Sequence, residues 1–213
     1  RVCLLSLAEE KAEKLRMNGC EVHVTHDVGL KAFWNAAESP NHPGTSVACV
    51  GMSCWTEPEQ VREDFDGEPD LVLLCVKSYA LQDSAFLNRV RRLVPNENGV
   101  ILSMCNGLGN LESLSTHFND CITAAATSYE AAHLVNVRSK ESRVAVAHHA
   151  SGRTVLGAHN LIGIEQRAVT AKLEHVANLL RESGSNALLL SHQNAMRETW
   201  WKAIVRSVVL LEQ

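Results

Sequence analysis

The feature that most constrains the fold is an apolar run that ends in a glycine-containing turn and leads into a helical pattern. Val100–Met104 is nearly continuously apolar, as in a parallel strand covered on both faces. The stretch Cys105–Asn110, with two glycines, interrupts the run, and Leu111–Phe118 resumes with helical spacing. A strand that ends this way places polar groups at the carboxyl edge of a sheet, where open α/β folds bind ligands. Because Asn and Gly are also the commonest turn residues, a purely conformational role for this turn stays open.

Strand and helix patterns alternate along most of the chain. Strands are expected at Val2–Leu5, Cys20–Thr25, Ser46–Val50, Leu71–Val76, Val100–Met104, Cys121–Ser128, Val144–His148, Arg153–Leu156 and Ala187–Leu190. Helices are expected at Ala8–Met17, Leu30–Ala37, Leu81–Leu93, Leu111–Phe118, Ile164–Glu182 and Asn194–Leu211, and a surface loop at Glu57–Asp70. This alternation predicts an α/β layer with a mostly parallel sheet. The Ser151-Gly152 turn signal predicts an antiparallel pair of its two flanking strands at one edge of that sheet.

Composition and charge exclude several classes of function. The chain has 213 residues, of which 46% are hydrophobic and 21% charged, as in ordinary globular proteins. Its net charge of -4 gives no reason to expect nucleic acid or an anionic membrane as a partner. Apolar runs stay below the roughly 18 residues that a transmembrane helix needs. The seven cysteines include no C-x-x-C pair, which favours reduced thiols in a cytoplasmic protein.

Metal and hydrolase sites find no support in the sequence. None of the ten histidines is joined to a cysteine or carboxylate at ligand spacing, so no metal site is expected. A Ser-His-Asp hydrolase is not expected, because the chain contains no G-x-S-x-G elbow. The start at Arg1 and the uncapped helical pattern Ala203–Leu211 lead us to expect a fragment of a longer polypeptide.

Short segments spread along the chain resemble the ketopantoate reductase (2-dehydropantoate 2-reductase) family. They are Leu71–Tyr79, Cys105–Asn110, Ala124–Ser128, Gly152–Gly157 and Trp200–Ile204, in the family's order. The resemblance implies a Rossmann-like, mostly parallel α/β sheet that lacks its first strand and Gly-rich turn and is followed by the start of an all-helical domain. The implied domains are 1–192, an incomplete NADP-binding domain, and 193–213, the first helix of a truncated substrate domain.

The same resemblance implies an activity. The family reduces ketopantoate to pantoate with NADPH, a step of pantothenate biosynthesis, so a small 2-keto acid is the implied partner and a homodimer is compatible. Two alternatives stay open. In the first alternative, the chain is a related 2-keto acid reductase. In the second, it is a catalytically inactive Rossmann-like fragment with a binding or assembly role.

Two matched positions carry the implied chemistry. Lys202 matches the family's general acid, whose ammonium stabilises the charge that develops on a ketone oxygen and delivers a proton. Asn106 matches the asparagine beside the nicotinamide, where an amide can both donate and accept. Without the resemblance, Lys202 reads as a solvated helix lysine and Asn106 as a turn residue. Trp200 and Trp201 are expected to pack where the last helix meets the first domain.

Further positions are implied as cofactor or substrate contacts. Lys77, after a strand, matches a contact near the adenosine 2′-phosphate, although a solvated lysine would look the same. Glu130 matches a backbone contact to the cofactor at a position where the family commonly has a small residue. Ser6 stands where NADP-preferring members often have arginine, so NADP rests on the family alone. Arg206 replaces a substrate-binding asparagine one turn after Lys202, and it either clamps a carboxylate or points to solvent.

Overall fold

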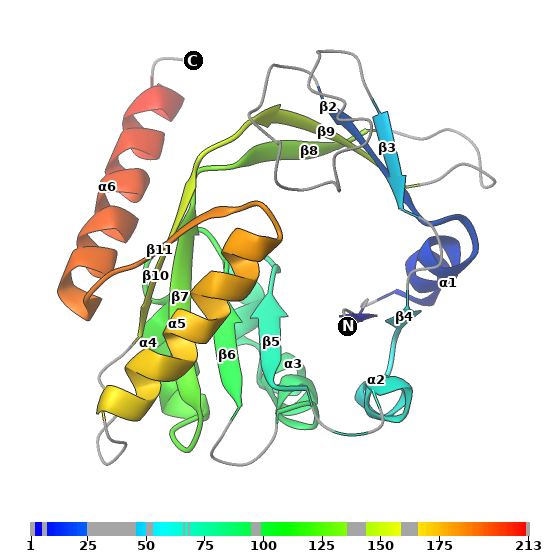
Figure 1. The fold of residues 1–213 in the computed structure, drawn as a ribbon, viewed down its shortest axis with the longest axis horizontal. Helices are drawn as coiled ribbons and strands as arrows, with labels where there is room; N and C mark the ends of the chain where they lie inside the picture. The colour runs from blue at the N-terminus through cyan, green and yellow to red at the C-terminus, as the bar shows by residue number, and fades with distance from the viewer. Residues whose placement is uncertain are drawn as a thin grey trace. The chain divides into compact units, whose positions relative to one another are not determined.

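The chain divides into two compact units, which are described one at a time. The computed structural model describes residues 3–5, 8–24, 46–49, 53–65, 67, 69–94, 99–135, 144–158 and 166–211, with the backbone alone at 24, 46–49, 65, 166 and 206–211. One unit comprises Arg1–Glu68 and Tyr129–Gly152, and the other comprises Pro69–Ser128 and Arg153–Gln213 (Figure 1). The predicted boundary between residues 192 and 193 stays a prediction.

The second unit is built on a mixed sheet. Its strands are β5 (Leu71–Leu74), β6 (Val100–Ser103), β7 (Ile122–Ser128), β10 (Arg153–Ala158) and β11 (Asn186–Leu189). Their order is β11-β10-β7-β6-β5. The strands β5, β6 and β7 are parallel neighbours, whereas β10 runs antiparallel to β7 and parallel to β11. The predicted α/β fold class with parallel strands is confirmed.

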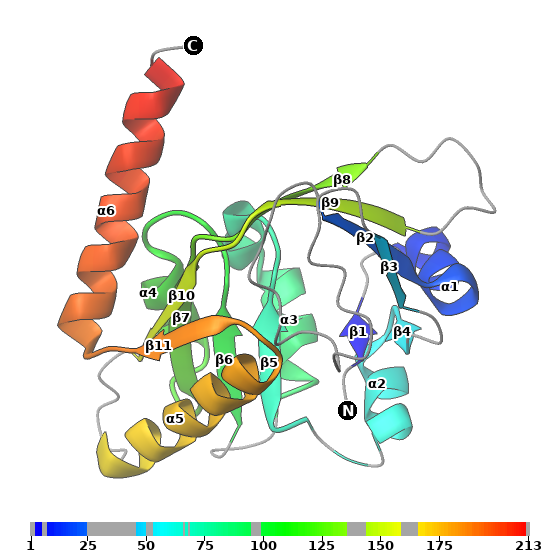
Figure 2. The ribbon, with the colours of Figure 1, turned by 45° about the horizontal axis from the view of Figure 1, so that its top comes forward.

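Helices cover both faces of this sheet. They are η1 (Ser78–Gln82), α3 (Ser84–Arg91), α4 (Asn110–His117), α5 (Gln166–Glu182) and α6 (His192–Leu211). One hydrophobic cluster joins α5 to β6, β7, β10 and β11, and a second joins η1, α3 and α4 to β5 and β6. Figures 1 and 2 show α5 on one face and α3 with α4 on the other, while α6 lies beside β10.

The strand β6 has the environment that its sequence predicts. Val100 and Leu102 pack in the α5 cluster, whereas Ile101 packs in the opposite cluster. All residues of β6 are buried, and β5 and β7 flank it on either side. A strand buried on both faces gains from a continuous apolar run, so the sequence pattern and the position of β6 agree.

The predicted antiparallel pair around Ser151-Gly152 is wrong. The strand β9 (Val144–Ala150) pairs with β2 and β8, whereas β10 pairs with β7 and β11. The physical reason for the glycine is close approach, because a Cβ on Gly152 would lie 2.5 Å from the Tyr129 carbonyl oxygen. Ser151-Gly152 therefore links strands of two different sheets and is not a hairpin turn.

Other departures have local causes. The helix predicted at Leu81–Leu93 is split into η1 and α3, because the Asp83 side chain caps α3 by accepting from the Ala85 N–H at 2.9 Å. The loop expected at Glu57–Asp70 contains α2 (Pro58–Phe65), which begins with a proline in the position that favours helix starts. The helix predicted at Leu30–Ala37 lies outside the described residues.

The described residues of the first unit form two small sheets and two helices. Its elements are β1 (Leu4–Leu5), α1 (Glu9–Asn18), β2 (Cys20–Val24), β3 (Ser46–Cys49), β4 (Cys54–Trp55), α2, β8 (Ala131–Val135) and β9. The strand orders are β1-β4 and β3-β2-β9-β8. The expected stop of α1 is confirmed, because Gly19 has φ 74 and its N–H bonds the Leu15 carbonyl.

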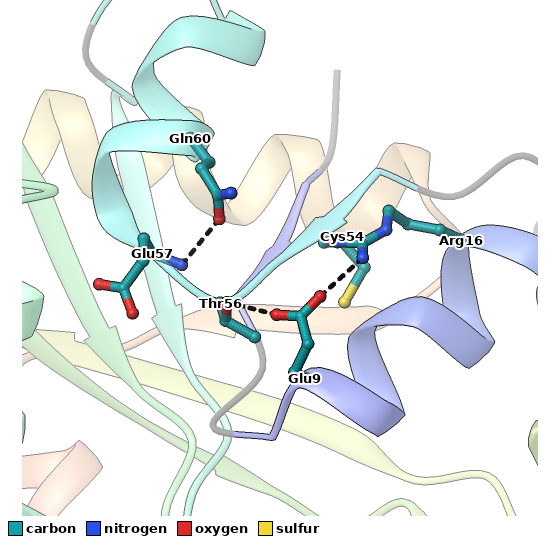
Figure 3. A network of polar contacts seen from close by, with 6 residues as sticks. All are labelled: Glu9, Arg16, Cys54, Thr56, Glu57 and Gln60. Carbon is teal, nitrogen blue, oxygen red and sulfur yellow. Dashed lines mark hydrogen bonds and ion pairs between the residues drawn. The ribbon is translucent and has the colours of Figure 1, made fainter.

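A polar network ties α1 to β4 in this unit (Figure 3). Arg16 donates to Glu9 Oε1 at 2.8 Å and to the Cys54 carbonyl at 2.8 Å, and Thr56 donates to Glu9 Oε2 at 2.7 Å. The Thr56 hydroxyl, followed by Arg16, holds the pKa of the Glu9 carboxyl below its usual value. Arg16 also lies 5.0 Å from the centroid of the Trp55 ring. Residues far apart in sequence thereby fix the position of α1 on β4.

A second ion pair makes the stability of the other unit depend on pH. Arg91 in α3 donates to Asp120 Oδ1 at 2.7 Å, and this bond lowers the pKa of the Asp120 carboxyl. A carboxyl whose folded-state pKa is depressed adds stability above its unfolded pKa of about 3.9, and the gain is lost as pH falls through the folded pKa. Since the side chains are 38% and 34% exposed, we expect about 1 kcal/mol or less after solvent screening.

Urea unfolding of Asp120→Asn and of the unchanged protein at neutral and at acidic pH checks this expectation. The variant should have the lower midpoint at neutral pH, and the difference should vanish at low pH. Asp83→Asn, whose side chain can still cap α3, is a matched control for loss of a carboxylate. A deficit of Asp120→Asn that stays constant with pH would contradict the role of this ion pair.

Two further findings concern membranes and thiols. Among the residues that the structure describes, no helix is long and apolar enough to cross a bilayer. The cysteines in the described part of the chain form no disulfide bond with one another; they are Cys3, Cys20, Cys54, Cys75, Cys105 and Cys121.

Candidate functional site

Polar groups follow each of the three adjacent parallel strands at their carboxyl ends. Lys77 comes three residues after β5, Asn106 comes three residues after β6, and Ser128 is the last residue of β7. Because β5, β6 and β7 are parallel neighbours, these ends share one edge of the sheet. Open α/β sheets bind ligands at this edge.

The turn that carries Asn106 is closed by a buried side chain. Asn110 is 7% exposed, and its Nδ2 donates to the carbonyls of Cys105, Asn106 and Gly107 at 3.2, 3.3 and 3.2 Å. Gly107 and Gly109 have φ values of 110 and 80, which other residues rarely adopt. The turn is therefore held by Asn110 and by glycine geometry, and the Asn106 side chain does not contribute to closing it.

The structure brings the two residues with implied catalytic roles together. Lys202 Nζ, on α6, donates to Asn106 Oδ1 at 2.7 Å and to the Ser128 carbonyl oxygen. Lys202 and Asn106 are 96 positions apart in sequence. An amide oxygen and a backbone carbonyl can both accept hydrogen bonds, so together they direct the N–H groups of the Lys202 ammonium. The arrangement thus places a directed proton donor at the carboxyl edge of the sheet.

The structure places the remaining predicted site residues as follows. Lys77 is exposed at the end of β5. Glu130 follows β7, and its Oε2 lies 2.8 Å from His148 Nε2. Ser6 lies outside the described residues, and for Arg206 the structure describes the backbone within α6 only. The structure therefore joins Lys202 to Asn106 and leaves the roles of the others as predictions.

The expected packing of the two tryptophans is wrong. Trp200 and Trp201 are 52% and 62% exposed on α6. Side chains of α6 that do meet the sheet include Ala195, Thr199 and Lys202, at helical spacing of four and three residues.

Sequence reasoning missed several supporting contacts. Asn110 belongs to a matched segment, but the sequence shows only an asparagine at the start of a helix. Nothing in that pattern indicates that its side chain donates to three carbonyls of the turn. Thr127 Oγ1 lies 2.8 Å from Thr199 Oγ1, and these residues are 72 positions apart. No local pattern could have joined them.

Two cysteines also lie near this edge, beside the ammonium and the amide. Desolvation of the sulfur atom, and then the neighbouring Cys105 thiol, raises the pKa of the Cys75 thiol just after β5, which disfavours a thiolate there. Within the described ranges, no group of three or more His, Cys, Asp or Glu side chains could hold a metal ion.

Comparisons with known proteins give a family and a fold. The family model "Ketopantoate reductase PanE/ApbA" matches residues 6–160. No curated protein matches the chain significantly. A 2-dehydropantoate 2-reductase from Geobacter metallireducens GS-15 has 24% identity and a TM-score of 0.53, over 88% of this chain and 48% of its own.

Two further solved structures have the same fold at lower identity. D-mandelate dehydrogenase with NADH and anilino(oxo)acetate has 17% identity and a TM-score of 0.62, over 95% of this chain and 52% of its own. A PanE/ApbA family ketopantoate reductase from Ralstonia eutropha JMP134 has 17% identity and a TM-score of 0.55, over 86% and 46%. The chain therefore spans about half the length of the solved structures that it matches.

Proposed function

This chain belongs to the ketopantoate reductase PanE/ApbA family, and on that premise we propose that its full-length protein reduces a 2-keto acid with NADPH. The proposed substrate is ketopantoate and the product pantoate, a step of pantothenate biosynthesis. The observation that carries the proposal is the 2.7 Å bond from Lys202 Nζ to Asn106 Oδ1 at the carboxyl edge of the sheet.

The residues at this edge fit a nicotinamide dinucleotide. When bound, NADPH supplies the hydride. The amide oxygen of Asn106 accepts a hydrogen bond from Lys202, which leaves the amide NH2 as the group that orients the nicotinamide carboxamide in this proposal. Lys77, Glu130 and Ser6 are proposed as further cofactor contacts. The preference for NADP over NAD rests on the family.

Lys202 is proposed as the general acid. Reduction of a ketone builds negative charge on its oxygen, and an ammonium stabilises that charge before giving up a proton from Nζ. The acceptors Asn106 Oδ1 and Ser128 O hold the Lys202 Nζ in one direction. Because the lysine side chain is already ordered, it loses less conformational entropy when the substrate binds. Arg206 is proposed to contact the substrate carboxylate. Cytoplasmic location and a homodimer remain predictions.

An assay of the full-length protein with NADPH and a panel of 2-keto acids tests the function. We expect NADPH oxidation that depends on ketopantoate, with weaker or no turnover of aryl 2-keto acids. Turnover that prefers an aryl 2-keto acid would favour the related reductase. NADPH binding without turnover of any member of the panel would favour the inactive alternative and contradict the proposal.

A further inference from the structure

We propose that Thr127 and Thr199 are positioning residues for Lys202, because their hydroxyl–hydroxyl bond fixes the turn of α6 that carries the ammonium. The Oγ1 atoms are 2.8 Å apart, between β7 and α6. The functional part of this proposal rests on the proposed reduction. The structural part concerns the position of Nζ alone.

One stripe of α6 follows the sheet from β10 to β7. His192 Nδ1 donates to the Ala158 carbonyl at 2.7 Å, and Ala195 then meets Gly157, also in β10. Thr199 next meets Thr127, and Lys202 reaches the adjacent Ser128 carbonyl. Steps of three, four and three residues keep this stripe on one face of the helix. Thr199 is therefore the last anchor of the helix before Lys202.

The direction of the threonine bond follows from its neighbours. Thr199 Oγ1 donates to the Ala195 carbonyl at 3.1 Å, and a carbonyl can only accept. The single Thr199 proton is then used, so Thr127 donates to Thr199. Hydrogen bonds that point the same way along such a chain strengthen one another. Thr127 is 7% exposed and is held opposite Val155 in the β7·β10 ladder, so the donor is fixed in place.

Helix stability does not explain a threonine at position 199. A β-branched residue has lower helix propensity than Ala or Leu, and a hydroxyl that bonds the carbonyl four residues earlier tends to weaken a helix. What Thr199 gains is the bond across to β7. A second contact between α6 and the sheet runs from Arg153 to the Glu198 carboxylate, at 2.8 and 2.9 Å. These two side chains are 47% and 21% exposed, so solvent screening weakens this ion pair as an anchor of the helix.

Lys202 needs this anchor because its own side chain is flexible. A lysine stem has several rotatable bonds, so the ammonium finds its acceptors only if the helix holds the Cα at the right distance. Removing the hydroxyl of Thr199 should let the third turn of α6 move on the sheet. Lys202 would then spend more time away from Asn106 and Ser128.

The test uses Thr199→Val in the full-length protein, which keeps the side-chain shape and removes the hydroxyl. Acylation of Lys202 by a small active ester, measured by mass spectrometry relative to Lys77, should become several-fold faster, since a bound ammonium reacts slowly. The turnover number should fall about tenfold, the effect of one buried hydrogen bond. In a Lys202→Ala background, Thr199→Val should cause no further loss.

Thr116→Val is the matched control. Thr116 makes the same bond to the carbonyl four residues earlier, at 2.9 Å, but it stands in α4 and not in the helix that carries Lys202. Thr116→Val should leave the labelling rate of Lys202 and the turnover number unchanged. Thr127→Val should reproduce Thr199→Val, the double variant should be no worse than either, and Thr199→Ser should recover both readouts.

Labelling also separates this proposal from the proposed function. Unchanged labelling of Lys202 in folded Thr199→Val would overturn the positioning role, whatever the turnover. Faster labelling in a protein that reduces no 2-keto acid would support the positioning role and contradict the reductase activity. If Thr199→Val does not fold, Thr127→Val takes its place. Labelling of Lys202 that is faster in Thr127→Val than in Thr199→Ser would support the positioning role, and equal labelling rates in the two variants would overturn it.

Discussion

Lys202→Met is expected to lower the turnover number with ketopantoate by about 10²–10⁴-fold in the full-length protein. Methionine keeps an unbranched side chain on α6 but removes the ammonium that donates to Asn106 and Ser128. If the ammonium acts mainly on the charge that develops during reduction, the loss falls on kcat, while NADPH affinity changes little. Steady-state kinetics together with a fluorescence titration of NADPH measure both quantities.

Two further variants make the result specific. Lys172→Met, in α5, removes a helix lysine from the same unit and should leave turnover unchanged. Lys202→Arg keeps a positive charge but gives up a proton far less readily, so partial activity would mean that charge stabilisation dominates over proton donation. Turnover of Lys202→Met within about twofold of the unchanged protein would remove Lys202 from the chemistry.

The elements of the sheet were predictable because their signals are local. A buried strand such as β6 must be apolar throughout, and helix α5 must show a 3.6-residue pattern, so both follow from short windows of sequence. Gly152 shows the limit of this reasoning. Turn glycines and close-approach glycines look identical in sequence, and only the neighbouring Tyr129 backbone shows which one this is.

The candidate site was predictable in part, and for a different reason. Lys202 and Asn106 were paired by resemblance to a family, since nothing in periodicity joins residues 96 positions apart. Thr127 lies in a matched segment, but nothing in the sequence joined it to Thr199, because threonine is common in both strands and helices. Thr127 and Thr199 meet through a long-range contact, which only the folded structure shows.

Gly157→Ala has the second largest expected effect because Gly157 sets the distance between β10 and α6. A Cβ added at Gly157 would lie 2.2 Å from the Ala195 Cβ, whereas ordinary contact begins at 3.4 Å. The first turns of α6 would therefore have to move by about 1 Å or more, and Lys202 would move with them. A displacement of that size near the chemistry can cost about 10²-fold in rate, and overpacking costs about 1–3 kcal/mol in stability.

A second substitution can undo this damage, which makes the prediction specific. In Gly157→Ala with Ala195→Gly, the new methyl group would face the Cα of residue 195 at 3.7 Å, an ordinary contact. Turnover should return to near that of Ala195→Gly alone, which itself loses about 1 kcal/mol of helix stability. Urea midpoints and ketopantoate turnover of the single and double variants measure this recovery. If Gly157→Ala were fully active, or if Ala195→Gly failed to restore it, the spacing of α6 on β10 would not control the position of Lys202.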